Sequence, residues 1–272
     1  MTPDTPARVV ERSGESDPGL RRASNQDRLL ADAPLFVVAD GMGGHEGGEE
    51  AAALAIEVFR AHGALYCETD VAAGLRTLVA EANESIHKKA QADLRLKGMG
   101  TTVVAALVHD DAVTIAHVGD SRAYRLRAGE LAVLTRDHSY VAELVELGAL
   151  TPEQAEKHPH ASLITRAVGT REQVEADVET HAVQDRDVFL LCSDGLTKMV
   201  PEAEVKQIVA AAERLDDATE RLIAAANKHG GEDNITVCLF RVSMPETTGR
   251  KQTTIVELSV IARAATAGRR AL

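Results

Sequence analysis

Residues 101–135 read TTVVAALVHDDAVTIAHVGDSRAYRLRAGELAVLT and carry the strongest signal of fold class in the chain. The stretch divides into apolar segments of strand length separated by turns of two or three residues. Connections this short join antiparallel neighbours, because a parallel crossover needs about a dozen residues or more. The stretch therefore predicts an antiparallel β meander, with strands at 101–108, 112–118, 121–127 and 131–135.

The segments on either side of the meander do not alternate strand and helix as a parallel sheet would require. Short strands, then two helices, precede the meander, and an irregular insert, a strand, two helices and a last strand follow it. This order predicts an α+β fold in which helices are segregated from antiparallel sheet. The expected strands are 8–13, 35–39, 187–192 and 235–242; the expected helices begin at Glu49 and cover 75–86, 201–212 and 215–228. Residues 40–48 are expected to be irregular because they are rich in glycine.

Composition excludes some classes of function. The 272 residues carry a net charge of −12 and few aromatic side chains, so nucleic acid is not an expected partner. The cysteines, Cys67, Cys192 and Cys238, are odd in number and form no CxxC pair, which favours a reducing compartment. Residues 1–12 hold no apolar signal segment, and no stretch is apolar for long enough to span a bilayer. We expect a cytoplasmic protein without a membrane span, and a monomer.

Aspartates recur at the ends of the predicted strands. Asp40, Asp120 and Asp194 each follow an apolar strand, whereas Asp27 and Asp233 each precede an apolar segment. If these strand ends share one edge, the carboxylates repel one another unless cations neutralise them. Oxygen ligands of this kind suit Mg²⁺ and Mn²⁺. The competing interpretation is that pairs such as Asp40-Gly41 are ordinary turn residues.

Six short motifs follow one another along the chain: GLRRASNQD (19–27), VADGMGGH (38–45), GTT (100–102), VGDSR (118–122), CSDG (192–195) and EDNIT (232–236). They occur in the order found in bacterial metal-dependent protein phosphatases of type 2C, and the chain resembles that family from about Arg8 to Val242. Each motif is weak evidence by itself, but all six in order are specific. The resemblance implies a four-layer α-β-β-α sandwich, with two stacked antiparallel sheets flanked by helices and a metal cluster at one end.

The resemblance also implies residue roles. Asp40 is similar to the aspartate that bridges two metal ions, and Arg22 to the arginine that binds phosphate. The other implied metal ligands are the Gly41 carbonyl, Asp194 and Asp233. Asp27 is similar to a residue that acts indirectly, behind the direct ligands or through a water molecule. Asp120 is similar to the residue that, together with Asp194, holds a weaker third ion. Residues 137–169 are similar to a mobile flap beside the active site. The implied organisation is a loose segment 1–7, a phosphatase domain 8–242 and a C-terminal tail 243–272.

The implied activity is that of a protein serine/threonine phosphatase. Two inner Mn²⁺ or Mg²⁺ ions would activate a bridging water that attacks phosphoserine or phosphothreonine directly. The expected partners are phosphorylated proteins, the substrates of bacterial Ser/Thr kinases. Two alternatives stay open: a non-catalytic phosphoprotein-binding module, and a narrow-specificity regulatory phosphatase on the same fold.

Three other features are weighed against this mechanism. His45 follows Asp40 by five residues and is either a general acid or a loop residue, because Met42 stands directly after Asp40-Gly41. Cys192 is expected to be a buried strand thiol rather than a nucleophile. His158 and His160 are expected to lie in a surface loop rather than at a metal.

Overall fold

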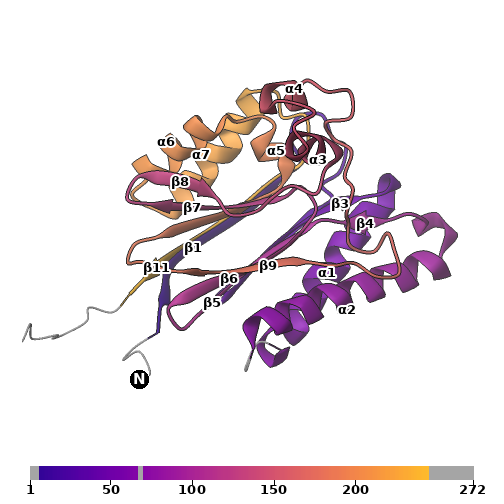
Figure 1. Cartoon of the computed structure of the whole chain (residues 1–272), viewed down its shortest axis with the longest axis horizontal. Helices are drawn as coiled ribbons and strands as arrows, with labels where there is room; N and C mark the ends of the chain where they lie inside the picture. The colour runs from indigo at the N-terminus through magenta and orange to yellow at the C-terminus, as the bar shows by residue number, and fades with distance from the viewer. Residues whose placement is uncertain (1–5, 67–69, 245–272) are drawn as a thin grey trace, which may run out of the picture.

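The computed structural model describes residues 6–66 and 70–244, which form two stacked antiparallel sheets (Figure 1). In spatial order, the first sheet contains β1 (Arg8–Asp17), β11 (Ile235–Ser243), β10 (Val188–Cys192), β7 (Arg122–Arg127) and β8 (Glu130–Val133). The second sheet contains β2 (Asp27–Asp32), β3 (Leu35–Met42), β5 (Val103–His109), β6 (Ala112–Val118) and β9 (Asp177–Ala182), and β4 (Gly100–Thr101) pairs with β3.

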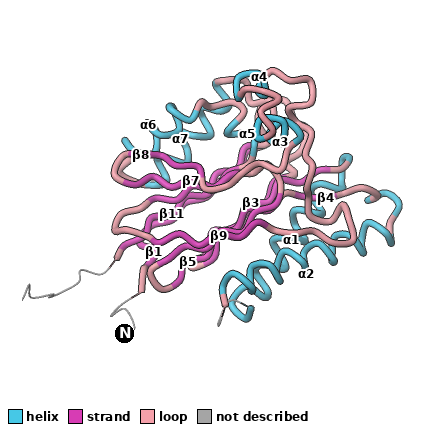
Figure 2. The backbone as a smooth tube through the Cα atoms, viewed as in Figure 1, coloured by secondary structure: helices cyan, strands magenta, loops and turns pink. Residues whose placement is uncertain are grey.

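Helices cover the outer face of each sheet (Figure 2). The β2–β9 sheet packs against α1 (Gly44–Tyr66) and α2 (Val71–Ala92), which a 3₁₀ turn (Leu94–Leu96) follows. The β1–β8 sheet packs against α6 (Glu202–Ala211) and α7 (Leu215–Lys228), with the short α5 (Asp194–Thr197) directly after β10. Between β8 and β9, the chain forms α3 (Tyr140–Glu146) and α4 (Pro152–Glu156). The predicted α+β class and four-layer sandwich are therefore confirmed.

Strand β5 shows why its segment reads as a continuous apolar run. Val103, Ala105 and Leu107 pack toward the helices, whereas Val104, Ala106 and Val108 pack toward the opposite sheet. A strand buried on both faces loses the alternation of apolar and polar residues. Between the sheets, the Phe36 and Phe240 rings stack with centroids 4.1 Å apart, so this layer is closely packed.

The prediction of a continuous meander is wrong at one turn. Strand β6 pairs with β5 and β9, whereas β7 pairs with β8 and β10, so the turn at Gly119-Asp120 crosses from one sheet to the other. Gly119 has a φ of 112°, and a Cβ there would lie 2.6 Å from Thr102 Cγ2. Turn length alone could not reveal the crossing, because both flanking strands are apolar enough to lie in either sheet.

One further prediction of local structure is wrong, and one strand was not predicted. In the glycine-rich segment 40–48, β3 continues to Met42 and α1 already begins at Gly44. Strand β9 was not predicted because its sequence, DVETHA, is polar; it lies at a sheet edge and pairs with β6 through its backbone. By contrast, the predicted helix start at Thr151-Pro152 is confirmed, since Thr151 and Gln154 form a reciprocal capping box.

Some sequence predictions fall outside the described residues. Most of segment 1–7, Cys67 and the tail beyond residue 244 are in this group. Within the described ranges, no helix is both long and apolar enough to cross a membrane.

Candidate metal centre

The predicted aspartates gather where strands of the two sheets end; Asp27, Asp40, Asp120, Asp194 and Asp233 are called the acidic edge below. Asp27 and Asp40 are register partners on β2 and β3. Asp194 is the first residue of α5, and Asp233 lies two residues before β11. Asp120 lies in the turn that connects β6 in one sheet to β7 in the other, and this crossing brings it to the same edge. Repulsion between these carboxylates contributes to the raised pKa values of Asp27, Asp40 and Asp120.

Asp27 is the most deeply buried member, with 1% of its surface exposed. Its Oδ2 accepts hydrogen bonds from Ser193 Oγ and Thr236 Oγ1, both at 2.7 Å, while its Oδ1 is buried without a hydrogen-bond partner. Burial, opposed by these two hydrogen bonds, raises the pKa of Asp27 to about 6, and repulsion from Asp194 contributes. The two hydrogen bonds to Oδ2 thus fix this carboxylate, while Oδ1 remains without a hydrogen-bond donor.

Asp40 has the central electrostatic position. Its pKa is raised well above the ordinary value, first by burial and then by repulsion from every other member of the acidic edge. Its backbone is fixed: the Asp40 N–H donates to Thr102 Oγ1 at 3.0 Å, and its carbonyl accepts from the Thr102 N–H at 2.8 Å. The motif Gly100-Thr101-Thr102 therefore positions the backbone of Asp40.

Asp120 and Asp194 are nearly buried, with 5% and 8% of their surfaces exposed, and each has an Oδ1 without a hydrogen-bond partner. Burial and the charge of Asp194 raise the pKa of Asp120 to about 7, although Lys198 opposes the shift. An unsatisfied buried carboxylate oxygen is costly unless a cation or a donor reaches it. These oxygens mark places where a cation would be stabilised.

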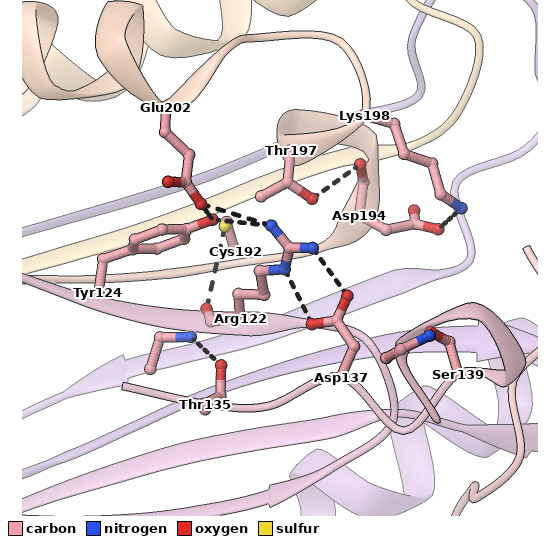
Figure 3. A network of polar contacts seen from close by, with 12 residues as sticks. Arg122, Tyr124, Thr135, Asp137, Ser139, Cys192, Asp194, Thr197, Lys198 and Glu202 are labelled. Carbon is pink, nitrogen blue, oxygen red and sulfur yellow. Dashed lines mark hydrogen bonds and ion pairs between the residues drawn. The ribbon is translucent and has the colours of Figure 1, made fainter. Parts of the chain in front are cut away.

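Two cationic side chains lie on the acidic edge. Arg22 Nη2 donates to Asp233 Oδ2 at 2.6 Å, and this hydrogen bond raises the pKa of the Arg22 guanidinium. Lys198 Nζ forms an ion pair with Asp194 Oδ2 from one turn further along the chain (Figure 3). Sequence reasoning singled out Arg22 but missed Lys198. Its spacing of four residues after Asp194 was the available signal, since residues that far apart meet on a helix.

Glycines permit close backbone approach beside two of the aspartates. A Cβ on Gly41 would lie 2.0 Å from the Gly48 carbonyl oxygen, and a Cβ on Gly195 would lie 2.0 Å from the Asn234 carbonyl oxygen. The first contact packs the end of β3 on the first turn of α1, and the second packs α5 on the start of β11. Glycine is thus required sterically at both positions, beyond its preference for turns.

Both ends of the segment 137–169 are held by residues that are sequence neighbours of the acidic edge or contact it. At its start, Arg122 donates two hydrogen bonds of 2.8 Å to Asp137 (Figure 3). The next residue, His138, donates its backbone N–H to the Gly119 carbonyl at 2.7 Å. At its end, Val168 and Thr101 exchange backbone hydrogen bonds of 2.9 and 3.0 Å. The predicted flap therefore begins beside the Asp120 turn and ends beside the strand that positions Asp40.

The remaining candidates lie as follows. His45, the candidate general acid, has its side chain outside the described residues. Cys192 is fully buried, and burial raises the pKa of its thiol to about 12, so the prediction of a non-nucleophilic strand thiol is supported. His158 and His160 lie in the loop after α4, where their rings contact that of Tyr140.

The residues of the acidic edge fit divalent cations by their chemistry. Within 6–66 and 70–244, no three His, Cys, Asp or Glu side chains are already arranged around a metal position, and Asp194 and Asp233 are held by Lys198 and Arg22 instead. Yet Asp27, Asp120 and Asp194 each present a buried carboxylate oxygen without a partner. An all-oxygen donor set with this repulsion is the kind that hard divalent cations bind. The site thus combines a cluster of carboxylates with an arginine that is hydrogen-bonded to one of them.

Comparisons with known proteins identify the family. The family model described as protein phosphatase 2C matches residues 21–236. The serine/threonine phosphatase stp of Listeria monocytogenes is 42% identical over 210 residues, covering 76% of this chain and 83% of the relative. Protein phosphatase PhpP of Streptococcus pneumoniae is 39% identical over 248 residues, covering 87% of this chain and 98% of the relative.

Solved structures extend the likeness to the fold. The serine/threonine phosphatase PstP/Ppp of Mycobacterium tuberculosis superposes with a TM-score of 0.82 at 36% identity, covering 88% of this chain and all of that one. The catalytic domain of PstP with two manganese ions gives a TM-score of 0.80 at 36% identity, covering 88% of this chain and 99% of that one.

The two-sheet sandwich and the family match together define the class of this protein as a phosphatase. This chain belongs to the protein phosphatase 2C family. The predictions of family and of a serine/threonine protein phosphatase are confirmed by the same matches.

Proposed function

We propose that the acidic edge binds two divalent cations, Mn²⁺ or Mg²⁺, and that the enzyme uses them to hydrolyse phosphoserine and phosphothreonine in proteins. The observation that carries the proposal is the convergence of five aspartates, of which Asp27, Asp120 and Asp194 keep a buried, unpartnered oxygen. The two manganese ions in the structure of the PstP catalytic domain support the same cofactor. The alternative of a non-catalytic binding module has no comparable support, since every predicted carboxylate is present.

The inner cations would be held by Asp40, the Gly41 carbonyl, Asp194 and Asp233. Asp27 would contribute indirectly, behind these ligands or through a water molecule. Divalent cations bound there would neutralise the carboxylates and supply an activated water for in-line displacement at phosphorus. Asp120 and Asp194 would hold the weaker third ion. Cys192 takes no part, because its thiol is buried and stays protonated.

Arg22 would bind and orient the phosphoryl group. Its planar guanidinium matches two phosphate oxygens, a geometry that a lysine ammonium cannot reproduce. The side chain is about half exposed, so a phosphorylated side chain can reach it from solvent. Its hydrogen bond to Asp233 holds the guanidinium over the acidic edge until a phosphoryl group competes for it.

The natural substrates would be proteins phosphorylated by bacterial Ser/Thr kinases, acted on by a monomeric enzyme in the cytoplasm. The segment 137–169 would act as the flap beside the site within a phosphatase domain 8–242. A narrow-specificity regulatory enzyme remains the alternative for substrate range.

The test uses the full chain with phosphoserine, phosphothreonine and phosphotyrosine peptides of one sequence. We expect release of inorganic phosphate from the first two in Mn²⁺, complete loss of activity in EDTA, and recovery when Mn²⁺ is returned. Full activity after exhaustive chelation would contradict a metal-dependent mechanism. Preference for the phosphotyrosine peptide would contradict the substrate class.

Asp120→Ala is expected to keep the fold and the two inner cations but to lower turnover at saturating Mn²⁺ by about 10- to 100-fold. The reason is that Asp120 reaches the acidic edge from the crossing turn, whereas Asp40, Asp194 and Asp233 remain in place. The measurements are a crystal structure of the variant in Mn²⁺ and its turnover.

Asp111→Ala, which removes an exposed aspartate from the β5–β6 turn, is the matched control and should keep wild-type turnover. Two inner ions with unchanged turnover in Asp120→Ala would show that the third site is dispensable. Loss of all ions would show that Asp120 is an inner ligand instead.

A further inference from the structure

Lys198 places a positive charge within the acidic edge itself. Its ammonium pairs with Asp194 Oδ2, and Figure 3 shows the two side chains turned toward each other from successive turns of the chain. The Lys198 side chain is 36% exposed, while that of Asp194 is 12% exposed. One end of the pair is therefore a nearly buried carboxylate, and the other is a cation that can withdraw to solvent.

The field acting on Lys198 comes from more than its partner. Burial by itself would lower the pKa of Lys198, but the charge and hydrogen bond of Asp194 raise it above the ordinary value, with Asp120 and Asp40 adding to the attraction. In return, the Lys198 charge counteracts part of the rise in the pKa of Asp120. Asp120 and Asp194, the residues proposed to hold the weaker third ion, are called the outer position below. The charge of Lys198 thus acts on both carboxylates of this position.

Two carboxylate oxygens of the outer position remain without a partner when Lys198 pairs with Asp194. Asp194 Oδ1 and Asp120 Oδ1 are both buried without a hydrogen-bond partner, although Lys198 is adjacent to Asp194. A single ammonium supplies one unit of charge and at most three hydrogen bonds. A divalent cation supplies twice the charge and takes several oxygen ligands at once. The position is therefore able to bind either cation, but an ion that uses Asp194 Oδ2 must displace the ammonium.

We propose that Lys198 is an internal competitor for the outer cation position formed by Asp120 and Asp194. This inference rests on the proposed function, because it presupposes that divalent cations bind the acidic edge. With Lys198 on Asp194, the charge of the outer position is partly neutralised without a third ion. The third ion binds only when the free cation concentration is high enough to displace the lysine, so Lys198 sets the concentration at which the outer position fills.

The inference predicts a specific change in Mn²⁺ binding. In Lys198→Met, which keeps an unbranched side chain one atom shorter and without charge, the weakest Mn²⁺ site should tighten by about tenfold or more, while the tighter sites change less. Lys198→Gln should behave in the same way, and Lys198→Arg, which keeps the charge, should stay near wild type. The measurement is the number and affinity of bound Mn²⁺ ions, from the electron paramagnetic resonance signal of the free ion during titration of the full chain.

Two controls assign the effect to the outer position. Lys206→Met removes a lysine that pairs with Glu130 on the surface at 2.8 Å, and it should leave every Mn²⁺ affinity unchanged. The double variant Lys198→Met/Asp120→Ala should lose the tightening, because the outer position then lacks one of its carboxylates. Thermal unfolding of each variant establishes that it is folded.

The outcomes separate the inference from the proposed function. If wild type and both uncharged variants bind the weakest Mn²⁺ equally, Lys198 is not a competitor, while the metal centre stands. If the tightening persists in the double variant, the competition is not at the Asp120 position and the inference is overturned. If wild type binds no Mn²⁺, the inference and the proposed metal centre fall together.

Discussion

Asp40→Asn is expected to abolish phosphatase activity, with a fall in kcat of at least about 10³-fold, and to weaken Mn²⁺ binding more than the same change at Asp194 or Asp233. Asp40 is the member of the acidic edge whose pKa is raised by repulsion from all the others, which places it at their electrostatic centre. The amide keeps the size of the side chain but removes the charge and one anionic oxygen. The measurements are turnover on a phosphothreonine peptide and Mn²⁺ binding.

The matched control is Asp32→Asn, at the far end of the same β2–β3 hairpin. Asp32 is 70% exposed and pairs with Arg12 at 3.4 Å, so this change should leave turnover and Mn²⁺ affinity as in wild type. Because the backbone of Asp40 is fixed by Thr102, Asp40→Asn should fold normally. A folded Asp40→Asn enzyme with near-wild-type turnover would remove Asp40 from the centre of the mechanism.

Arg22→Ala is expected to cost roughly 2–4 kcal/mol in kcat/KM, the range for loss of one preorganised donor to developing charge. A phosphate contact made equally in the ground and transition states raises KM alone, whereas a contact that strengthens as charge develops lowers kcat as well. The guanidinium is held over the acidic edge by Asp233, at 2.6 Å, so its orientation precedes substrate binding. Separate kcat and KM values on a phosphothreonine peptide distinguish the two cases.

Arg21→Ala is the neighbouring control, since Arg21 is also exposed and the change removes the same charge from the same loop. It should alter kcat/KM much less than Arg22→Ala. Arg22→Lys keeps the charge but not the planar fork, so it should recover only part of the loss. If Arg21→Ala and Arg22→Ala have equal effects, the general positive charge of the loop matters and Arg22 does not bind the phosphate specifically.

Local patterns predicted most of the secondary structure, and their failures have identifiable causes. Helix α7 begins and ends as predicted because its apolar residues recur with helical spacing along one face. Strand β9 was missed because an edge strand is held by backbone hydrogen bonds that leave no apolar signature in its sequence. In the segment 40–48, contact between Gly41 and Gly48 creates order that glycine content alone argues against.

The sequence predicted the aspartates of the candidate site but not the ion pairs that Arg22 and Lys198 form with them. The motifs identified each aspartate because the identity of a strand-end residue can be read directly from the chain. The pairing of Arg22 with Asp233 could not be read in this way, and that of Lys198 with Asp194 had only its four-residue spacing as a signal. The first joins residues 211 positions apart in sequence, and only packing of the loop before β2 beside β11 brings them together.

The sequence by itself determined the antiparallel α+β class, the six motifs and the set of carboxylates, because these depend on residue identity and on short-range spacing. Only the tertiary structure decided which strands share a sheet. Strands β6 and β7 are joined by a short turn, yet they lie in different sheets, because each has apolar faces that long-range packing must cover. That crossing carries Asp120 to the acidic edge, where burial and the neighbouring charges give Asp40 and Asp120 raised pKa values that no isolated turn would have.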